Sequence, residues 1–460
     1  MAGDPLLSRR AALRLAAVGG AGVVAAACNG GGDPGTPKAG AGAGTTVPEA
    51  PPLPGRPRNV RVSQDEFVAH VEPFLAVNPR DPRNLLGACI AHDREGATHI
   101  AAYASFDGGA SWRSLGGLED SANGRDPTVT FDAGGRGYVC ANTDNLHVWR
   151  TDDGGRTFAA PLLATRGHKL DHPWLAADPS PAAGEATWLY GAWTGPDNTQ
   201  LEFGRSTDGG RSFQAPRVLD TVAGPDQANF ASPMVAAGHG GTVHAVYGVW
   251  PPLPKSLPRP EFSAPIRVIS SSDRGETWGR PVELGNGVME IRVQPDTNGL
   301  GLPTVVAHRS RPLAAAAFVT RRPGATYADI GVCLSRDRGR TWTPPRPVPR
   351  PSDDTVYLQP QLAIDEAGRL ALSAFAYRQR QIEVVVLVAE PGTARFGPPR
   401  PVTSRPFDPA RGTLSGKHGA WWIGDYQGLA AAAGRLHPFW NDPRTGRLEI
   451  FTAAVPGGTG

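Results

Sequence analysis

The sequence predicts an all-β protein, a β-propeller built from four-stranded blades. Three observations favour this fold. A turn-like octapeptide occurs five times, an apolar strand-like segment precedes each copy, and the 460-residue chain contains 58 glycines and 46 prolines. That composition is typical of many short strands joined by tight turns. Units that recur every few tens of residues are typical of propellers and solenoids, so a propeller accounts for all three observations.

The repeated octapeptide has the pattern Ser/Thr-x-Asp-x-Gly-x-x-aromatic. Its copies are SFDGGASW, TDDGGRTF, STDGGRSF, SSDRGETW and SRDRGRTW, with the aspartate at Asp107, Asp153, Asp208, Asp273 and Asp337. The aspartate can accept hydrogen bonds from the turn backbone, the glycine can adopt a positive φ, and the aromatic ring can fold back between strands. We therefore predict that the five aspartates are structural. One carboxylate per turn is too few for a calcium site.

Successive aspartates are 46, 55, 65 and 64 residues apart, the period expected of repeated four-stranded sheets. Two further strand-like segments, EVVVLVA and LEIFTAA, lie at the corresponding place in later units that lack the octapeptide. The prediction is therefore seven blades, at about 65–118, 119–164, 165–220, 221–285, 286–349, 350–403 and 404–460. Six blades is the alternative, if unit 286–349 forms loops. The last unit lacks an outer strand, which the N-terminal segment 59–63 can supply to close the ring.

The N-terminal 28 residues have the features of an export signal. Arg9 and Arg10 precede an apolar run that is too short to span a bilayer comfortably. The arginine pair resembles a twin-arginine signal, and the alanines before Cys28 resemble the cleavage site of a bacterial lipoprotein. This interpretation predicts signal residues 1–28 and an exported protein, anchored to the outer face of the cell membrane through a lipid on Cys28. Residues 29–58 would then be a flexible Gly/Pro-rich tether to the domain at 59–460.

Most units also place a polar residue just before a proline or an apolar strand. These residues are Glu72, Asp126, Asp171 with His172, Ser232, Gln359 and Asp425. The first strand of each propeller blade lines the central channel, so we expect these side chains to meet at one mouth of the channel. Loops between second and third strands reach the same face. The predicted ligand-binding residues are Arg125, Asp171, His172, Gln359, Arg378, Arg444 and Trp250.

A structural role is the alternative for each carboxylate at this mouth. A carboxylate before an inner strand can cap backbone N–H groups or pair with an arginine of the next blade. Other chemistry has little support. The net charge of +3 indicates no nucleic-acid partner. We found no metal-ligand pair at helical spacing and no phosphate-binding loop in the sequence. We therefore expect no cofactor and no metal site, with a divalent ion in the channel left open.

The five octapeptides resemble the Asp boxes, or BNR repeats, of the sialidase superfamily, and the resemblance extends over residues about 65–456. It implies a secreted propeller that binds glycans or acts on them. The resemblance is specific for the fold and weak for activity, because similar boxes occur in glycosidases, in receptors and in assembly factors.

The resemblance also implies a catalytic set. Its members are an arginine triad that binds the substrate carboxylate, a tyrosine nucleophile assisted by a glutamate, and an aspartate acid/base. The first unit should then carry Arg-Ile-Pro, but it reads Val71-Glu72-Pro73. The nearest match is Arg125-Asp126-Pro127. The candidate catalytic residues are accordingly Asp126, Tyr426, Asp425 and Glu72, with Arg378 and Arg444 as possible carboxylate clamps.

Three functions stay open. The leading interpretation is an exported lipoprotein that binds a glycan or another extracytoplasmic ligand at the central mouth. The first alternative is an exo-acting glycoside hydrolase of the sialidase type, so the sequence leaves open whether the protein is an enzyme. The second is a scaffold for protein interaction or assembly. The expected partners are a glycan or small-molecule ligand, a protein in the scaffold case, and the membrane only through the lipid anchor.

Overall fold

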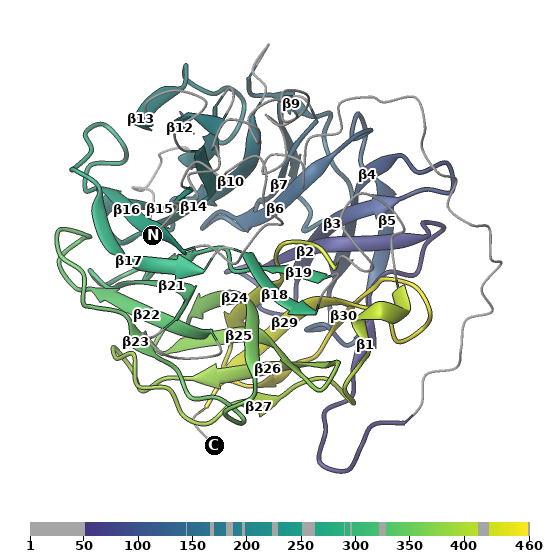
Figure 1. Ribbon diagram of the computed structural model, residues 1–460. Coiled ribbons are helices and arrows are strands. Elements are labelled where there is room, and N and C mark those ends of the chain that lie inside the picture. The colour runs from purple at the N-terminus through teal and green to yellow at the C-terminus, as the bar shows by residue number, and fades with distance from the viewer. Residues whose placement is uncertain are drawn as a thin grey trace, which may run out of the picture.

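The computed structural model is a ring of seven four-stranded antiparallel sheets with the first strand of each at the centre (Figure 1). The structure describes residues 51–143, 145–165, 170–180, 187–195, 198–222, 229–250, 263–288, 290–294, 297–321, 328–412 and 423–458. The signal segment, Cys28 and tether residues 29–50 lie outside these ranges. Within them, the only helices are short 3-10 turns, and none could cross a membrane. The predicted all-β propeller is confirmed.

Each of the first four blades is a meander of consecutive strands. Blade 1 holds β2 (Ala69–Val77), β3 (Leu85–His92), β4 (Thr98–Ser105) and β5 (Arg113–Gly117). Blade 2 holds β6 (Arg125–Phe131), β7 (Gly137–Asn142), β8 (Leu146–Thr151) and β9 (Leu162–Leu163). Blade 3 holds β10 (Asp171–Ala177), β11 (Leu189–Thr194), β12 (Gln200–Ser206) and β13 (Arg217–Thr221). Blade 4 holds β14 (Asn229–Gly238), β15 (Thr242–Trp250), β16 (Ser263–Ser271) and β17 (Val282–Val288).

The last three blades include the irregular unit that left the blade count open. Blade 5 holds β20 (Thr304–Ala307), β21 (Ala314–Thr320), β22 (Asp329–Ser335) and β23 (Arg346–Pro347). Blade 6 holds β24 (Val356–Ile364), β25 (Leu370–Arg378), β26 (Gln381–Val388) and β27 (Arg400–Pro401). Blade 7 holds β28 (Gly428–Ala432), β29 (Arg435–Asp442), β30 (Glu449–Thr452) and, as its outer strand, β1 (Val60–Arg61); β31 (Val455–Pro456) also pairs with β29. The irregularity is an extra hairpin, β18 (Glu290–Gln294) with β19 (Thr297–Leu300), inserted before a complete blade 5. Seven blades are confirmed.

The two ends of the domain close the ring. Val60 pairs with Thr452 and Arg61 with Phe451, so β1 completes blade 7 as predicted. Next to this seam lies a group of buried polar side chains that we call the closure cluster: Ser63, Asp65, His70, Tyr103 and Glu449. The His70 Nε2 atom lies 2.9 Å from Asp65 Oδ1, and the Tyr103 hydroxyl donates to Asp65 Oδ2 at 2.7 Å. The Ser63 hydroxyl donates to Glu449. The hydrogen bonds of the closure cluster thus connect the N-terminal segment to blades 1 and 7.

The repeated turns share one hydrogen-bond pattern, seen at Asp208. The Ser206 hydroxyl accepts from the Gly210 N–H at 2.9 Å and donates to Asp208 Oδ1 at 2.7 Å. Asp208 also accepts from the N–H and the hydroxyl of Ser212. Partial burial alone would raise the pKa of Asp208, but these hydrogen bonds outweigh it and lower the pKa to about 2. Equivalent bonds form at Asp107, Asp153, Asp273 and Asp337.

The aromatic residue of the turn packs against the preceding blade. The ring of Trp112 in blade 1 lies 5.4 Å from that of Phe439 in blade 7. Trp278 in blade 4 lies 4.8 Å from Phe203 in blade 3, edge to face. Such contacts bury aromatic surface between sheets. The octapeptide therefore stabilises both its own turn and the packing between neighbouring blades.

Candidate functional site

A repeated backbone irregularity directs the polar side chains at the channel. In five inner strands, β2, β6, β10, β14 and β24, the residue before a proline has a positive φ. These residues are Glu72 (54°), Asp126 (52°), His172 (46°), Ser232 (44°) and Gln359 (49°). Positive φ at a non-glycine residue costs on the order of 1–3 kcal/mol and persists only where the surrounding fold imposes it.

Each of these residues lies in a β-bulge. In blade 1, Val71 pairs with Ile90 and the next aligned pair is Phe74 with Ala88, so Glu72 and Pro73 face a single residue of β3. The pairing is interrupted in the same way at Asp126, His172, Ser232 and Gln359. A bulge re-aims the side chain that it carries. Blade 7 reaches an equivalent place with Gly424 (φ 79°), directly before Asp425.

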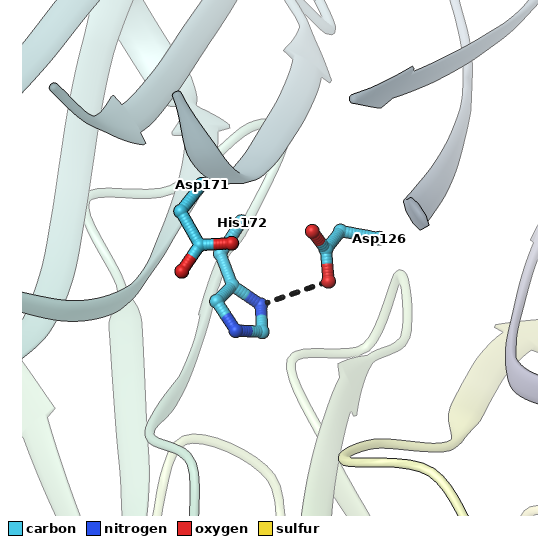
Figure 2. A group of neighbouring side chains, drawn as sticks. All are labelled: Asp126, Asp171 and His172. Atoms are coloured by element: carbon cyan, nitrogen blue, oxygen red, sulfur yellow. Dashed lines mark ion pairs between the residues drawn. The ribbon is translucent and has the colours of Figure 1, made fainter. Parts of the chain in front are cut away.

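The bulges bring together five side chains that we call the channel ring: Glu72, Asp126, Asp171, His172 and Asp425. Figure 2 shows the carboxylates of Asp126 and Asp171 and the imidazole of His172 facing one another. One ligand atom of each lies within 4.8 Å of the others. The His172 Nδ1 atom is 3.3 Å from Asp126 Oδ1. The four carboxylates predicted to converge therefore share one place, next to a single imidazole.

Burial within the channel ring is uneven. Glu72, Asp126 and Asp425 are at most 1% exposed. Asp171 and His172, like the neighbouring Arg125, are only partly buried. The ring thus has a buried floor of three carboxylates and an accessible side formed by blades 2 and 3.

The electrostatics of the channel ring follow from this burial. Desolvation, together with the charges of Asp425, Asp126 and Asp171, raises the pKa of Glu72 well above its usual value. Desolvation likewise raises the pKa of Asp171 to about 6; the charge of His172 opposes this rise, and the charges of Asp126 and Asp425 add to it. Burial alone would lower the pKa of His172, but the carboxylates outweigh it and raise that pKa. Negative charge is in excess at this site.

Several buried oxygen atoms near the channel ring lack a hydrogen-bond donor. Within the described part of the chain, neither carboxylate oxygen of Glu72 has a hydrogen-bond partner, nor have the side-chain oxygens of Gln359 and Gln427. The Asp425 backbone N–H favours the charged form of Glu72 without reaching hydrogen-bond geometry. The amide groups donate instead to backbone carbonyls, Gln359 to Gly424 at 2.5 Å and Gln427 to Gln359 at 2.9 Å. The site has a surplus of acceptors.

Aromatic side chains fill the channel beside the ring. The aromatic ring of Trp174 lies 4.7 Å from the aromatic ring of Phe74 and 5.6 Å from that of Tyr426, and both contacts are edge to face. A cavity of about 10 Å³ remains between these aromatic residues and the channel ring; its lining includes His172, Trp174, Ser232, Gln359, Asp425 and Tyr426. That volume suits about one water molecule. The cavity is therefore too small to hold a sugar.

The two arginines predicted as carboxylate clamps pair with carboxylates that are not part of the channel ring. The Arg378 Nε atom pairs with Asp354 at 2.9 Å on the surface. Arg444 pairs with the buried carboxylate of Asp442 and donates to Asn59 at 3.1 Å. It therefore lies where the N-terminal segment closes the propeller.

Two further predicted residues are placed by the following contacts. The Tyr426 hydroxyl donates to the Pro127 carbonyl at 3.0 Å. Trp250 ends β15, but its side chain lies outside the described residues.

Three residues at the site were not predicted. Gln427 and Phe74 follow predicted residues by one or two positions, and Trp174 follows His172 by two. Alternation along a strand was the available signal, because residues i and i+2 of an inner strand face the same side. The bulges obscured it.

Comparison with known proteins supports the fold. No family model matches the chain, and no curated protein does. Among solved structures, an ulvan lyase of a polysaccharide lyase family is 10% identical over 87% of this chain and 96% of its own, with a TM-score of 0.54. A sialidase from a Hadza microbial source is 15% identical over 87% of this chain and 68% of its own, with a TM-score of 0.43. The sheet order and the likeness to the ulvan lyase identify the fold as a seven-bladed β-propeller.

Proposed function

We propose that the protein is an exported binding propeller that takes an uncharged glycan at the accessible side of the channel ring. The observation that carries the proposal is the convergence of Asp171, His172 and Arg125, all partly exposed, beside a buried group of carboxylates. Carboxylate oxygens accept hydrogen bonds from sugar hydroxyls, and a surplus of acceptors suits a ligand rich in donors. The glycan class comes from the Asp-box resemblance and from the glycan-acting propellers of similar fold, an argument by analogy.

The charge of the site argues against an acidic sugar. Binding a substrate carboxylate needs converging arginines, but Arg378 and Arg444 are paired with Asp354 and Asp442 away from the channel ring. The ring itself carries four carboxylates and one imidazole. A sialic acid would meet repulsion there, so the proposed ligand is neutral.

We also propose that the chain reaches its ligand outside the cytoplasm. The supporting feature is the sequence of residues 1–28, with its arginine pair, apolar run and Cys28. Fractionation of cells that produce the protein tests this directly. The wild type should be in the membrane fraction and Cys28→Ser in the soluble one, and an unprocessed N-terminus in the wild type would contradict the proposal.

Glycan binding is tested on an array of neutral, amino and acidic glycans with the mature chain, residues 28–460. We expect binding to neutral glycans, weakened at least tenfold by Arg125→Ala or His172→Ala. Asp81→Asn is the matched control, since Asp81 is an exposed carboxylate between the first two strands of blade 1. Absence of binding, or equal binding by all variants, contradicts the proposal. Co-purification of a protein instead would support a scaffold.

A glycoside hydrolase is the second candidate, favoured by one observation. One carboxylate oxygen of Asp126 and one of Asp171 are at most 4.8 Å apart, a spacing compatible with the roughly 5–5.5 Å between the two carboxyl groups of retaining glycosidases. A panel of fluorogenic glycosides tests it. Turnover that is abolished by both Asp126→Asn and Asp171→Asn supports hydrolysis, and no turnover across the panel removes this candidate.

A further inference from the structure

We propose that the channel ring binds a divalent metal ion of the Zn²⁺ or Mn²⁺ type, with Asp126, Asp171 and His172 as its protein ligands. The inference concerns the same ring as the proposed function but does not depend on a glycan. The sequence analysis expected no metal site but left a divalent ion in the channel open, and the inference takes up that open point.

The first support is geometric. A metal ion at about 2.0–2.1 Å from two ligands in tetrahedral arrangement holds those ligand atoms about 3.3–3.4 Å apart. The His172 Nδ1 atom and Asp126 Oδ1 are 3.3 Å apart. The ligand atom of Asp171 lies within 4.8 Å of the other two and faces them (Figure 2). Rotation of the Asp171 side chain toward the other two ligand atoms would complete a three-ligand set.

The second support is independent of the three ligands. Glu72 is 0% exposed, and within the described chain neither of its carboxylate oxygens has a hydrogen-bond partner. Its nearest charged neighbours are the other carboxylates of the ring. The oxygen of Gln359, which is 2% exposed and lines the same cavity, likewise has no donor. Native proteins rarely bury such acceptors unpaired, and a cation or its bound water supplies what they lack.

The chemistry of the ligand set selects the metal. Two carboxylates and one imidazole suit Zn²⁺ or Mn²⁺ better than Ca²⁺, which prefers six to eight oxygens. Three protein ligands leave coordination positions open, the usual arrangement where a metal meets water or a second ligand. The accessible side of the ring, at Asp171 and His172, is where such a position would face solvent.

A metal at the ring would also decide between the two candidate functions. An Asp171 that binds a metal is ionised, and it cannot then act as the proton donor of a glycosidase. A bound ion with open positions can instead accept the hydroxyl oxygens of a sugar. The metal would therefore favour binding over this form of hydrolysis.

The experiment uses the mature chain, residues 28–460, without an affinity tag and without any sugar. After removal of metals with a chelator, the protein is titrated separately with Zn²⁺, Mn²⁺ and Ca²⁺ by calorimetry. We expect one equivalent of Zn²⁺ or Mn²⁺ to bind at least tenfold more tightly than Ca²⁺. Asp171→Asn and His172→Ala should each weaken binding by tenfold or more, while Asp81→Asn should not change it.

A variant that fails to fold is recognised by its thermal unfolding. Glu72→Gln then provides the decisive variant, because it replaces a buried carboxyl group with an amide of similar shape. We expect it to fold and to bind the metal at least threefold more weakly. The inference is overturned if no metal binds stoichiometrically or if all variants bind it equally. Either result would mean that a proton alone holds the His172–Asp126 pair. Since no sugar is present in the titration, a failure to bind metal would not contradict the proposed glycan binding. Likewise, an absence of binding on the glycan array would not contradict the proposed metal site.

Discussion

The closure cluster and the channel ring are both groups of buried carboxylates around one histidine, yet their hydrogen bonding differs. In the closure cluster, Asp65 accepts from Tyr103 and contacts His70, whose other ring nitrogen lies 3.1 Å from the Leu448 carbonyl. In the channel ring, both oxygens of Glu72 lack partners within the described chain. A satisfied buried network stabilises a fold, whereas a half-satisfied one costs stability. This difference is why we assign the first cluster to the fold and propose a ligand for the second.

The largest expected effect is on the closure cluster. Asp65→Ala leaves His70 and the Tyr103 hydroxyl buried without their shared acceptor. Breaking a buried pair by removing one partner costs about 3–5 kcal/mol, so we expect a loss of that size in the free energy of unfolding, measured by urea denaturation. Asp81→Asn is the control. A loss below about 1 kcal/mol, the range of surface pairs, would show that the cluster is not structural.

The second effect has the opposite sign. Burial and neighbouring carboxylates raise the pKa of Glu72, so in metal-free protein at neutral pH this carboxyl costs stability either as a buried charge or through proton uptake on folding, and Glu72→Gln removes that cost. We expect an increase of about 1–3 kcal/mol in the free energy of unfolding at pH 7.5. Thermal and urea unfolding of both proteins in chelator measure it. Destabilisation by this variant would contradict the contrast between the two clusters, because it would make Glu72 a fold-stabilising residue like Asp65.

A third, smaller effect concerns pH and the repeated turns. The pKa of Asp208 in the folded protein, about 2, lies below its ordinary value of 3.8. The folded state therefore releases this proton more readily than the unfolded state, and the stabilisation is complete above about pH 4 and is lost as pH falls through about 2. Asp208→Asn should cost about 1 kcal/mol at pH 7 through its weakened turn hydrogen bonds. The difference from wild type should shrink at about pH 2, and a difference that is constant with pH would refute this account.

The smallest effect is expected at Arg378. Its partner Asp354 is 45% exposed and the arginine itself 49%, and exposed pairs contribute little. Arg378→Ala should change the free energy of unfolding by less than about 0.5 kcal/mol. It should also leave glycan and metal binding unchanged, because the pair lies away from the channel ring. Loss of either binding activity would place Arg378 at the site after all.

Much of the fold could be predicted because its determinants are local. The octapeptide carries its own hydrogen-bond acceptor, glycine and aromatic ring within eight residues, so its role is readable without the rest of the chain. The closing strand was predictable because blade 7 lacked an outer strand. The extra hairpin β18–β19 was not, and it is the reason why unit 286–349 seemed irregular.

The site was predictable in part. The residue before proline marked where five inner strands bulge, so Glu72, Asp126 and His172 could be chosen as site residues from the sequence. The ion-pair partners of Arg378 and Arg444 could not be predicted. A loop that lies near the channel does not specify which carboxylate its long arginine side chain will contact.

The sequence alone determined the propeller fold, the turns that stabilise its blades and the set of acidic residues in the inner strands, since each depends on short-range patterns. The structure decided between six and seven blades. Only the tertiary structure decided which of those acids are satisfied. The Tyr426 hydroxyl donates to a carbonyl 299 residues away, whereas neither carboxylate oxygen of Glu72 has a hydrogen-bond partner among the described residues. Hydrogen-bond satisfaction depends on the three-dimensional neighbours of each group, and the closed ring brings those neighbours from every part of the chain.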